Sequence, residues 1–234
     1  GQKEMKLALI LGLVNPNIGG ILLVGPRGTG KTTAVRSLID LLPMVERSTC
    51  HYGCLPSEIE EGGIDAVCPD CAKKYGEGQS LTRASRVRLI ELPLNAKLEN
   101  VVGGIDERAA MQSKIRLKRG ILAQADRNLL YLDEANLLND EVLDAILDAA
   151  AQGSYTLRRG AASATYKSRF LLVGSMNPEE GHLRPQIMDR FGLRVIVRGL
   201  EKPEERLKAY KQVENYLSAP HQLVAKYAGG TTAI

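Results

Sequence analysis

The segment Gly25–Thr32, which reads GPRGTGKT, most constrains what this chain can fold into. It fits the phosphate-binding P-loop pattern, in which glycines let the backbone curl so that successive N–H groups point at a phosphate. Such a loop needs a strand before it and a helix after it. Both are predicted, because Ile21–Val24 is a short apolar run and Lys31–Leu42 has helical apolar periodicity. The segment therefore predicts an α/β fold built around a phosphate-binding loop.

The residue types in this loop predict a nucleotide site that uses Mg²⁺. Lys31 should reach the β- and γ-phosphates, and the hydroxyl of Thr32 should bind the metal, with Thr33 as a second choice. The alternative is a glycine-rich turn that binds nothing. The predicted nucleotide-binding residues of the loop are Gly25, Pro26, Arg27, Gly28, Thr29, Gly30, Lys31, Thr32 and Thr33.

Strand patterns alternate with helical patterns along the rest of the chain, which predicts a parallel sheet covered by helices on both faces. An opening helix is expected over Gln2–Leu13, with Met5, Ala8, Leu9 and Leu13 on its buried face. The further predicted strands are Val87–Leu92, Leu129–Leu132, Phe170–Gly174 and Arg194–Val197.

Two acids follow the apolar run Leu129–Leu132 directly. Parallel strands deliver their carboxyl ends to one edge of a sheet, so Asp133 should arrive beside Thr32 and help to hold Mg²⁺. Glu134 could then accept a proton from an attacking water molecule. The alternative is a strand that simply ends in solvent.

Three further polar residues are candidates for the same chemistry. Asn177 follows the strand at Phe170–Gly174 and could position water or contact the γ-phosphate, although an Asn before a proline is also a common turn residue. Arg190, and secondarily Arg184, could act as a finger on a neighbouring subunit's γ-phosphate. Either arginine could instead only pair with an acid.

All four cysteines lie in one stretch, as Cys50, Cys54, Cys68 and Cys71. Two close pairs of this kind suit tetrahedral thiolate ligation of Zn²⁺, which would be structural because no ligand position stays open. Disulfides, unliganded thiols and an iron–sulfur cluster are the alternatives, and His51 could replace one thiolate.

Composition excludes few function classes but disfavours two. The 234 residues carry a net charge of only +4 and include two Phe, eight Tyr and no Trp, which leaves nucleic acid unsupported as a partner. No apolar run approaches the ~20 residues that cross a bilayer, so no membrane partner is expected. We expect a cytoplasmic protein.

Taken together, these motifs resemble the AAA+ ATPases of the helix-2-insert branch, and in particular the I subunits of magnesium chelatase. The resemblance covers about the first 200 residues. Besides the P-loop and the two acids, it rests on Leu92–Ala96, Val102–Asp106, Ala135–Leu138, Gly174–Gly181 and Leu183–Gln186.

The resemblance implies a ring, commonly hexameric, with ATP between subunits. Gly25–Thr32 would be Walker A, Asp133 and Glu134 Walker B, Asn177 sensor 1 and Arg190 the arginine finger, with Arg184 as a second contact in trans. The helix-2 insert would lie in Val101–Gln124 and the hairpin before sensor 1 in Ser154–Phe170, and both would contact partners.

In this family, hydrolysis drives a second subunit with an integrin-like domain, and a large porphyrin-binding subunit inserts Mg²⁺ into a tetrapyrrole. The same residues would also fit a MoxR-like remodelling ATPase acting on a protein with an integrin-like domain. Two further alternatives are a nucleotide-dependent assembly switch and a DNA-translocating ring, for which a convincing basic stripe is missing. The alternating charges of Lys114–Arg119 are either a partner contact or a solvated face.

The expected division places the AAA+ core at residues 1–200, with the cysteine-bearing insert at about 46–80. Residues 201–234 would form a connector, Glu204–Tyr216, and a loose tail, Ala228–Ile234. We expect the helical lid with its sensor 2 arginine to be missing, because the chain stops soon after the fifth predicted strand.

Overall fold

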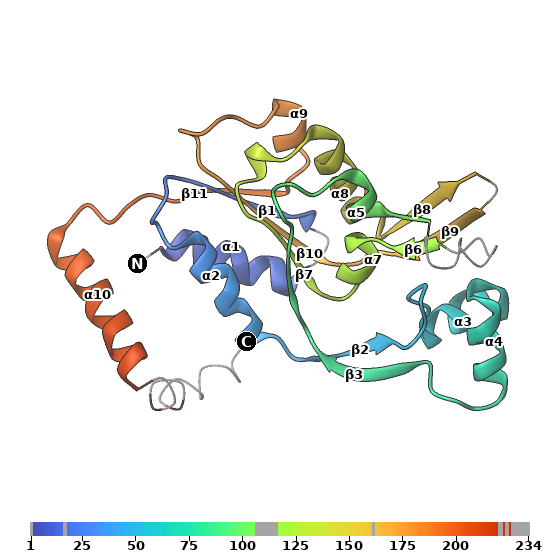
Figure 1. Ribbon diagram of the computed structural model, residues 1–234. Helices are drawn as coiled ribbons and strands as arrows, with labels where there is room; N and C mark the ends of the chain where they lie inside the picture. Colours follow the sequence, from blue (N-terminus) through green and yellow to red (C-terminus); the bar gives the residue numbers. More distant parts are fainter. Residues whose placement is uncertain are drawn as a thin grey trace.

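A five-stranded parallel sheet forms the centre of the fold (Figure 1). The computed structural model describes residues 2–15, 18–105, 117–160 and 162–219, together with residues 222 and 225. The strand order is β11-β1-β10-β7-β4, and all four pairings are parallel. The strands are β1 (Ile21–Val24), β4 (Leu89–Glu91), β7 (Leu129–Leu132), β10 (Leu171–Met176) and β11 (Leu193–Ile196).

The predicted strands are confirmed, with ends that move by one or two residues. The helix expected over Lys31–Leu42 is shorter than predicted: α2 spans Lys31–Ser37, and a 3₁₀ turn follows at Leu38–Leu41. Pro43 explains why helical structure stops after Leu41, because a proline disfavours the helical conformation of the residue before it, and Leu42 is extended with ψ 135°.

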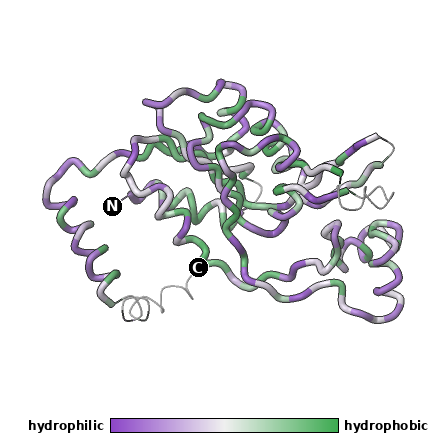
Figure 2. The backbone as a smooth tube through the Cα atoms, viewed as in Figure 1, coloured by the Kyte–Doolittle hydropathy of each residue, from purple (hydrophilic) through white to green (hydrophobic). Residues whose placement is uncertain are grey.

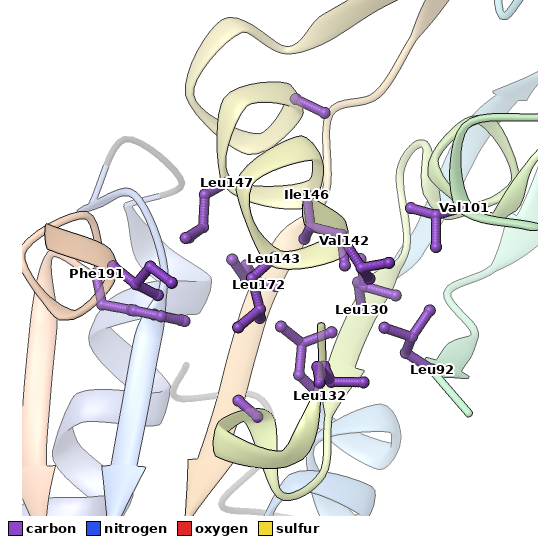
Figure 3. Close-up of a cluster of buried hydrophobic side chains, with 14 of the residues drawn as sticks. Leu92, Val101, Leu130, Leu132, Val142, Leu143, Ile146, Leu147, Leu172 and Phe191 are labelled. Atoms are coloured by element: carbon purple, nitrogen blue, oxygen red, sulfur yellow. The ribbon is translucent and has the colours of Figure 1, made fainter. Parts of the chain in front are cut away.

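One face of the sheet packs against α8 (Asp140–Gln152), α5 (Leu98–Val102), α7 (Ile121–Ala125) and α9 (Pro185–Met188). Figure 3 shows Leu143 and Ile146 of α8 above Leu130 and Leu172 of the sheet. The helix starts at Asn139, whose side chain accepts a hydrogen bond from the Glu141 amide. The residues buried here repeat at helical spacing along α8, which orients that helix on the sheet.

The opposite face of the sheet is covered by α1 (Lys3–Val14) and α2. Met5, Ala8 and Leu9 are buried there and Leu13 is partly buried against them, which confirms the predicted face of the opening helix. Successive strand residues point to opposite faces, so Leu129 and Tyr131 contribute to this core whereas Leu130 and Leu132 contribute to the other. Both layers of helices predicted from the sequence are therefore present.

Two hairpins project beside the sheet. The predicted hairpin at Ser154–Phe170 forms β8 (Ser154–Arg159) and β9 (Ala162–Lys167). Within the predicted helix-2 insert, β5 (Gly103–Ile105) pairs with β6 (Leu117–Arg119). In the charged stretch Lys114–Arg119, residues 117–119 thus form β6, whereas residues 114–116 lie outside the described residues.

The cysteines are carried by a long antiparallel ribbon that the sequence analysis missed. Its strands are β2 (Met44–Ser48) and β3 (Thr82–Arg86), and between them lie α3 (Pro56–Gly62), a 3₁₀ turn (Ile64–Ala66) and α4 (Pro69–Gly76). Neither ribbon strand buries a side chain, so neither shows the apolar alternation of a half-buried strand. We call residues 44–86 the cysteine insert; Figure 1 shows it extending away from the sheet.

The predicted connector forms α10 (Pro203–Ser218), which stands apart from the sheet in Figure 1. None of its side chains is buried, and Figure 2 shows that hydrophobic colour gathers in the central strands instead. Within the described ranges, no helix combines the length and the apolar character needed to span a membrane. The predicted tail at Ala228–Ile234 lies outside the described residues.

Candidate functional site

The carboxyl ends of β1, β7 and β10 meet at one edge of the sheet and form a pocket of about 330 Å³. This is the edge at which parallel α/β sheets bind ligands. The pocket gathers most of the residues predicted to handle a nucleotide and adds one that was not predicted, Ser175. Its lining is Arg27, Gly28, Thr29, Gly30, Lys31, Thr32, Thr33, Asp133, Glu134, Ser175 and Asn177.

The loop adopts the curled backbone that its glycines predict. Gly28 and Gly30 have φ of 76° and 83°, a conformation that residues with a side chain rarely take. The ammonium group of Lys31 lies across the loop and donates to the carbonyl oxygens of Gly25 at 2.7 Å and Pro26 at 2.8 Å. Burial lowers the pKa of Lys31 from its ordinary value, while the charges of Asp133 and Glu134 oppose that shift.

Asp133 and Thr32, the two residues predicted to bind the metal, lie side by side. The Thr32 hydroxyl lies 3.3 Å from Asp133 Oδ2, and Asp133 Oδ1 accepts hydrogen bonds from Ser175 Oγ at 2.6 Å and from the Tyr131 hydroxyl at 2.9 Å. Two donors thus hold one carboxylate oxygen and turn the other toward Thr32. A hydroxyl and a carboxylate are hard oxygen ligands of the kind that Mg²⁺ prefers, so the residues present fit this metal.

Tyr131 supports this pair from within the sheet. Its side chain is fully buried, and burial raises its pKa to about 12, so the hydroxyl stays protonated and donates to Asp133 at neutral pH. The same hydroxyl lies 3.1 Å from Thr32 Oγ1. Tyr131 therefore connects the two predicted metal ligands, Asp133 just beyond β7 and Thr32 on α2.

Glu134 adopts an unusual backbone conformation, with φ 53°. Its amide donates to Ser175 Oγ at 3.1 Å, and its carboxylate pairs with Arg27 of the loop at 3.0 Å. Arg27 also pairs with Glu180 at 2.6 Å. A non-glycine residue with positive φ is costly and persists only where surrounding contacts hold it, which is a common feature of functional sites.

Asn177 lies where the sequence predicts, one residue beyond β10 and in the wall of the pocket. It is only 4% exposed, and its Oδ1 accepts a hydrogen bond from the Glu179 amide at 3.3 Å. The side-chain oxygen is therefore held by the following turn, so the amide group has a fixed position next to the loop.

The two arginines predicted as trans-acting contacts lie away from this pocket, along α8. Arg190 pairs with Asp144 at 2.9 Å and with Asp148, and Arg184 pairs with Asp140 at 2.6 Å. Neither is among the described residues that line the pocket of their own chain. A finger that serves a neighbouring subunit has this property, but so does an arginine that only pairs with acids, and both alternatives stay open.

The four cysteines converge in the cysteine insert, as their spacing predicts. All four Sγ atoms lie within 4.8 Å of one another, and the Cys50 sulfur is 3.7 Å from Cys54 and 3.6 Å from Cys68. The hydrogen bond between the Cys50 and Cys54 side chains lowers the pKa of Cys50 to about 4, whereas the pKa of Cys54 is raised. Among the described residues, the group of possible ligands consists of these four cysteines and does not include His51.

Sequence reasoning missed Tyr131 and Ser175. A usable signal existed, because side chains two apart on a strand point to the same face. Tyr131 stands two residues before Asp133 and Ser175 two before Asn177, so each accompanies a residue that the motif reading had already selected. The contact of Arg27 with Glu134 and Glu180 had no such signal, since it joins segments that are distant in the sequence.

A larger groove of about 1170 Å³ adjoins the pocket and shares the loop residues Arg27–Gly30 with it. It runs between α1, α2 and α10, and its walls include apolar side chains, among them Met5, Leu9 and Leu38. The pocket on the sheet edge is therefore polar and close to the acids, whereas the adjoining groove offers apolar surface.

Comparisons with known proteins show the family of the chain. A family model described as "AAA domain" matches residues 17–175. The magnesium-chelatase subunit ChlI homolog of Methanocaldococcus jannaschii is 44% identical over 229 residues, which covers 97% of this chain and 61% of the relative. The magnesium-chelatase subunit ChlI of Euglena gracilis is 40% identical over 230 residues, covering 97% and 65%.

The chain thus spans a little over three fifths of the length of these relatives. Among solved structures, a chain of the complex between subunits BchI and BchD of magnesium chelatase, based on a cryo-EM reconstruction, is similar. It has a TM-score of 0.70 and 38% identity, and the match covers 100% of this chain and 70% of that one. The P-loop, the family model and these similarities together show that the chain belongs to the AAA+ ATPases, in the family of the magnesium chelatase I subunits.

Proposed function

We propose that this chain binds and hydrolyses ATP in a ring of identical subunits and that the ring drives metal insertion into a tetrapyrrole. The observation that carries the proposal is the single pocket that brings Lys31, Thr32, Asp133, Glu134 and Asn177 together. These are the groups that a P-loop ATPase uses to hold the triphosphate, hold the metal and position water.

Binding follows from the loop and the adjoining groove. The outer phosphates would replace the carbonyl oxygens of Gly25 and Pro26 as partners of the Lys31 ammonium group, because a phosphate carries negative charge and a carbonyl does not. The apolar groove between α1 and α10 is the place for the base. Mg²⁺, held by Thr32 and Asp133, would neutralise charge on the phosphates.

Hydrolysis needs a base and a positioned water molecule. Glu134 would take a proton from that water molecule while the oxygen of the water bonds to the γ-phosphorus. The bond between the γ-phosphorus and the β–γ bridging oxygen breaks, and ADP leaves. Asn177 would orient the water through its fixed side-chain amide. The ion pair with Arg27 at 3.0 Å engages Oε1 of Glu134, so either Arg27 moves away or the second carboxylate oxygen takes the proton.

Assembly supplies what the pocket of one chain does not contain. Arg190, with Arg184 as a second contact, would reach the γ-phosphate held by a neighbouring subunit, where such a group contributes about 10³–10⁵ in turnover. We propose a hexameric ring that acts on a partner with an integrin-like domain and on a large porphyrin-binding subunit. The names of the relatives support the chelatase reading, and the similar solved complex supports the assembly with a partner subunit.

The test is steady-state ATP hydrolysis by the parent chain, by Glu134→Gln and by Lys31→Ala. Glu134→Gln should retain ATP binding and lose hydrolysis, because a neutral amide cannot accept the proton. Lys31→Ala should lose binding as well, as measured by calorimetry. The matched control is Glu179→Gln, an exposed acid two residues after Asn177, which should behave like the parent. Equal turnover in Glu134→Gln and the parent would refute the assigned chemistry.

The Arg27–Glu134 ion pair favours one further candidate, a nucleotide-dependent assembly switch that rarely turns over. In that case nucleotide would assemble the partners while hydrolysis stays close to that of Glu134→Gln. Reconstitution with the candidate partners separates the remaining readings. Insertion of Mg²⁺ into a porphyrin supports the chelatase, whereas remodelling of an integrin-domain protein without pigment supports a MoxR-like ATPase.

A further inference from the structure

The cysteine insert has almost no hydrophobic core of its own. From residue 44 to 86 only Cys54, Leu55, Cys71 and Leu81 are buried, so two of the four buried side chains are cysteines. Helix α3 buries none of its residues and α4 buries only Cys71. Units near or below ~40 residues usually need a metal or disulfides to fold, so burial alone does not explain this unit.

The positions of the sulfurs match a single metal ion and not disulfides. In a tetrahedron with metal–sulfur bonds of about 2.3 Å, neighbouring sulfurs lie about 3.8 Å apart. The Cys50 sulfur lies 3.7 Å from Cys54 and 3.6 Å from Cys68, and all four cysteines are free. An iron–sulfur cluster would spread the thiolates further, because several iron and sulfide atoms would stand between them.

Backbone amides support thiolates at this place. The Tyr52 amide donates to Cys50 Sγ at 3.1 Å, and the Cys68 amide donates to Cys54 Sγ at 3.4 Å. Hydrogen bonds to the ligand atoms orient them and stabilise their negative charge, as is common around protein metal sites. A tetrahedron of four sulfur ligands suits zinc, and it leaves no open position for chemistry.

The loop that carries Cys50 and Cys54 also holds the β8–β9 hairpin. The Lys167 amide donates to the Tyr52 carbonyl at 3.2 Å, and the rings of Tyr52 and Tyr166 stack with centroids 5.5 Å apart. Glu58 of α3 pairs with Lys167 at 2.6 Å and also lies 3.6 Å from Arg169. The segment between these cysteines therefore has a sulfur ligand at each end and contacts β9 through Tyr52 in its middle.

We propose that Cys50, Cys54, Cys68 and Cys71 bind one zinc ion, and that this ion keeps the cysteine insert folded as the support of the β8–β9 hairpin. The ion is structural and has no part in the ATP chemistry, since none of its four ligands lines the pocket among the described residues. The proposal therefore goes beyond the proposed function and does not depend on it.

The first test measures the metal content of the purified full chain by elemental mass spectrometry. We expect one zinc per chain, loss of that zinc in Cys68→Ser, and retention in Cys68→His, because a histidine nitrogen can replace a thiolate. The control Ile64→Ser changes an exposed residue of the same insert and should keep its zinc. Stoichiometric iron, the absence of metal in the parent chain, or disulfides found by mass would overturn the site.

The second test measures hydrogen exchange at the Lys167 amide before and after removal of zinc from the parent chain with a chelator. Exchange should accelerate by at least about tenfold, because the amide loses its fixed acceptor at Tyr52. Lys167→Met should keep the zinc while it loosens the hairpin, since it removes only the ion pair with Glu58. An insert that stays folded and an unchanged exchange rate after zinc removal would overturn the support role.

Discussion

Ser175→Ala is the sharpest test of how the pocket is held together. Ser175 is 1% exposed, donates to Asp133 Oδ1 at 2.6 Å and accepts from the Glu134 amide at 3.1 Å. The substitution removes a hydrogen bond to a charged group, a loss of about 1.5–3 kcal/mol, and leaves the Glu134 amide without its acceptor, which costs about 1–3 kcal/mol. Because the two losses share one atom, we expect a decrease of about 2–4 kcal/mol in the free energy of unfolding.

The effect on catalysis should be separate from the effect on folding. Without Ser175, Asp133 and Glu134 lose their shared anchor, and a displacement near 1 Å at such a site can cost about 10²-fold in rate. We expect kcat for ATP to fall by about 10- to 100-fold and the Mg²⁺ concentration needed for half-maximal rate to rise. Both are measured at a temperature at which the variant is fully folded, with urea unfolding as the stability assay.

Ser168→Ala is the matched control. Ser168 is also fully buried, but its hydroxyl donates to the Leu122 carbonyl at 3.2 Å, outside the pocket. It should lower stability by about 0.5–1.5 kcal/mol and leave kcat and the Mg²⁺ requirement unchanged. If Ser175→Ala also kept the parent's kcat and Mg²⁺ requirement, the reasoning that Ser175 positions the two acids would be refuted.

Two other predictions concern Arg190 and Tyr131. Arg190→Ala should retain ATP binding and lose most hydrolysis in the assembled ring. The control Arg194→Ala removes an exposed ion pair with Asp189 and should keep the parent's hydrolysis. Equal turnover in both variants would remove Arg190 from the finger role. The pKa of Tyr131 is raised from 10.0 to about 12, so the unfolded chain loses this proton first as pH rises. The parent's stability should therefore fall between about pH 10 and 12 more than that of Tyr131→Phe, and parallel urea midpoints for the two proteins would contradict this.

The central sheet could be predicted closely because its strands are short apolar runs with clear ends. The runs Ile21–Val24 and Leu129–Leu132 were placed without error, and the other three predicted strands differ by one or two residues at their ends. The ribbon of the cysteine insert was not found, because its two strands bury no side chain and have no apolar period to detect. The pairing of two such strands depends on the folded segment between them.

For the pocket, the chain order of motifs was sufficient to select Lys31, Thr32, Asp133 and Asn177. Parallel strands must end at a common edge, so residues just beyond those ends must meet there. The hydrogen-bond partners of these residues were not selected. A serine or a tyrosine inside a strand looks like any buried polar residue until the neighbouring strand is in place.

The sequence by itself determined the P-loop, the polar residues that follow the ends of the strands, and the grouping of the four cysteines in one segment. Each of these depends on local spacing along the chain. Only the tertiary structure decided that Arg27 pairs with Glu134, that Ser175 holds Asp133 and that the cysteine loop supports β9. These contacts join residues separated by more than 40 positions in the chain. Their geometry follows from how the sheet, the insert and the hairpin pack, which no local pattern specifies.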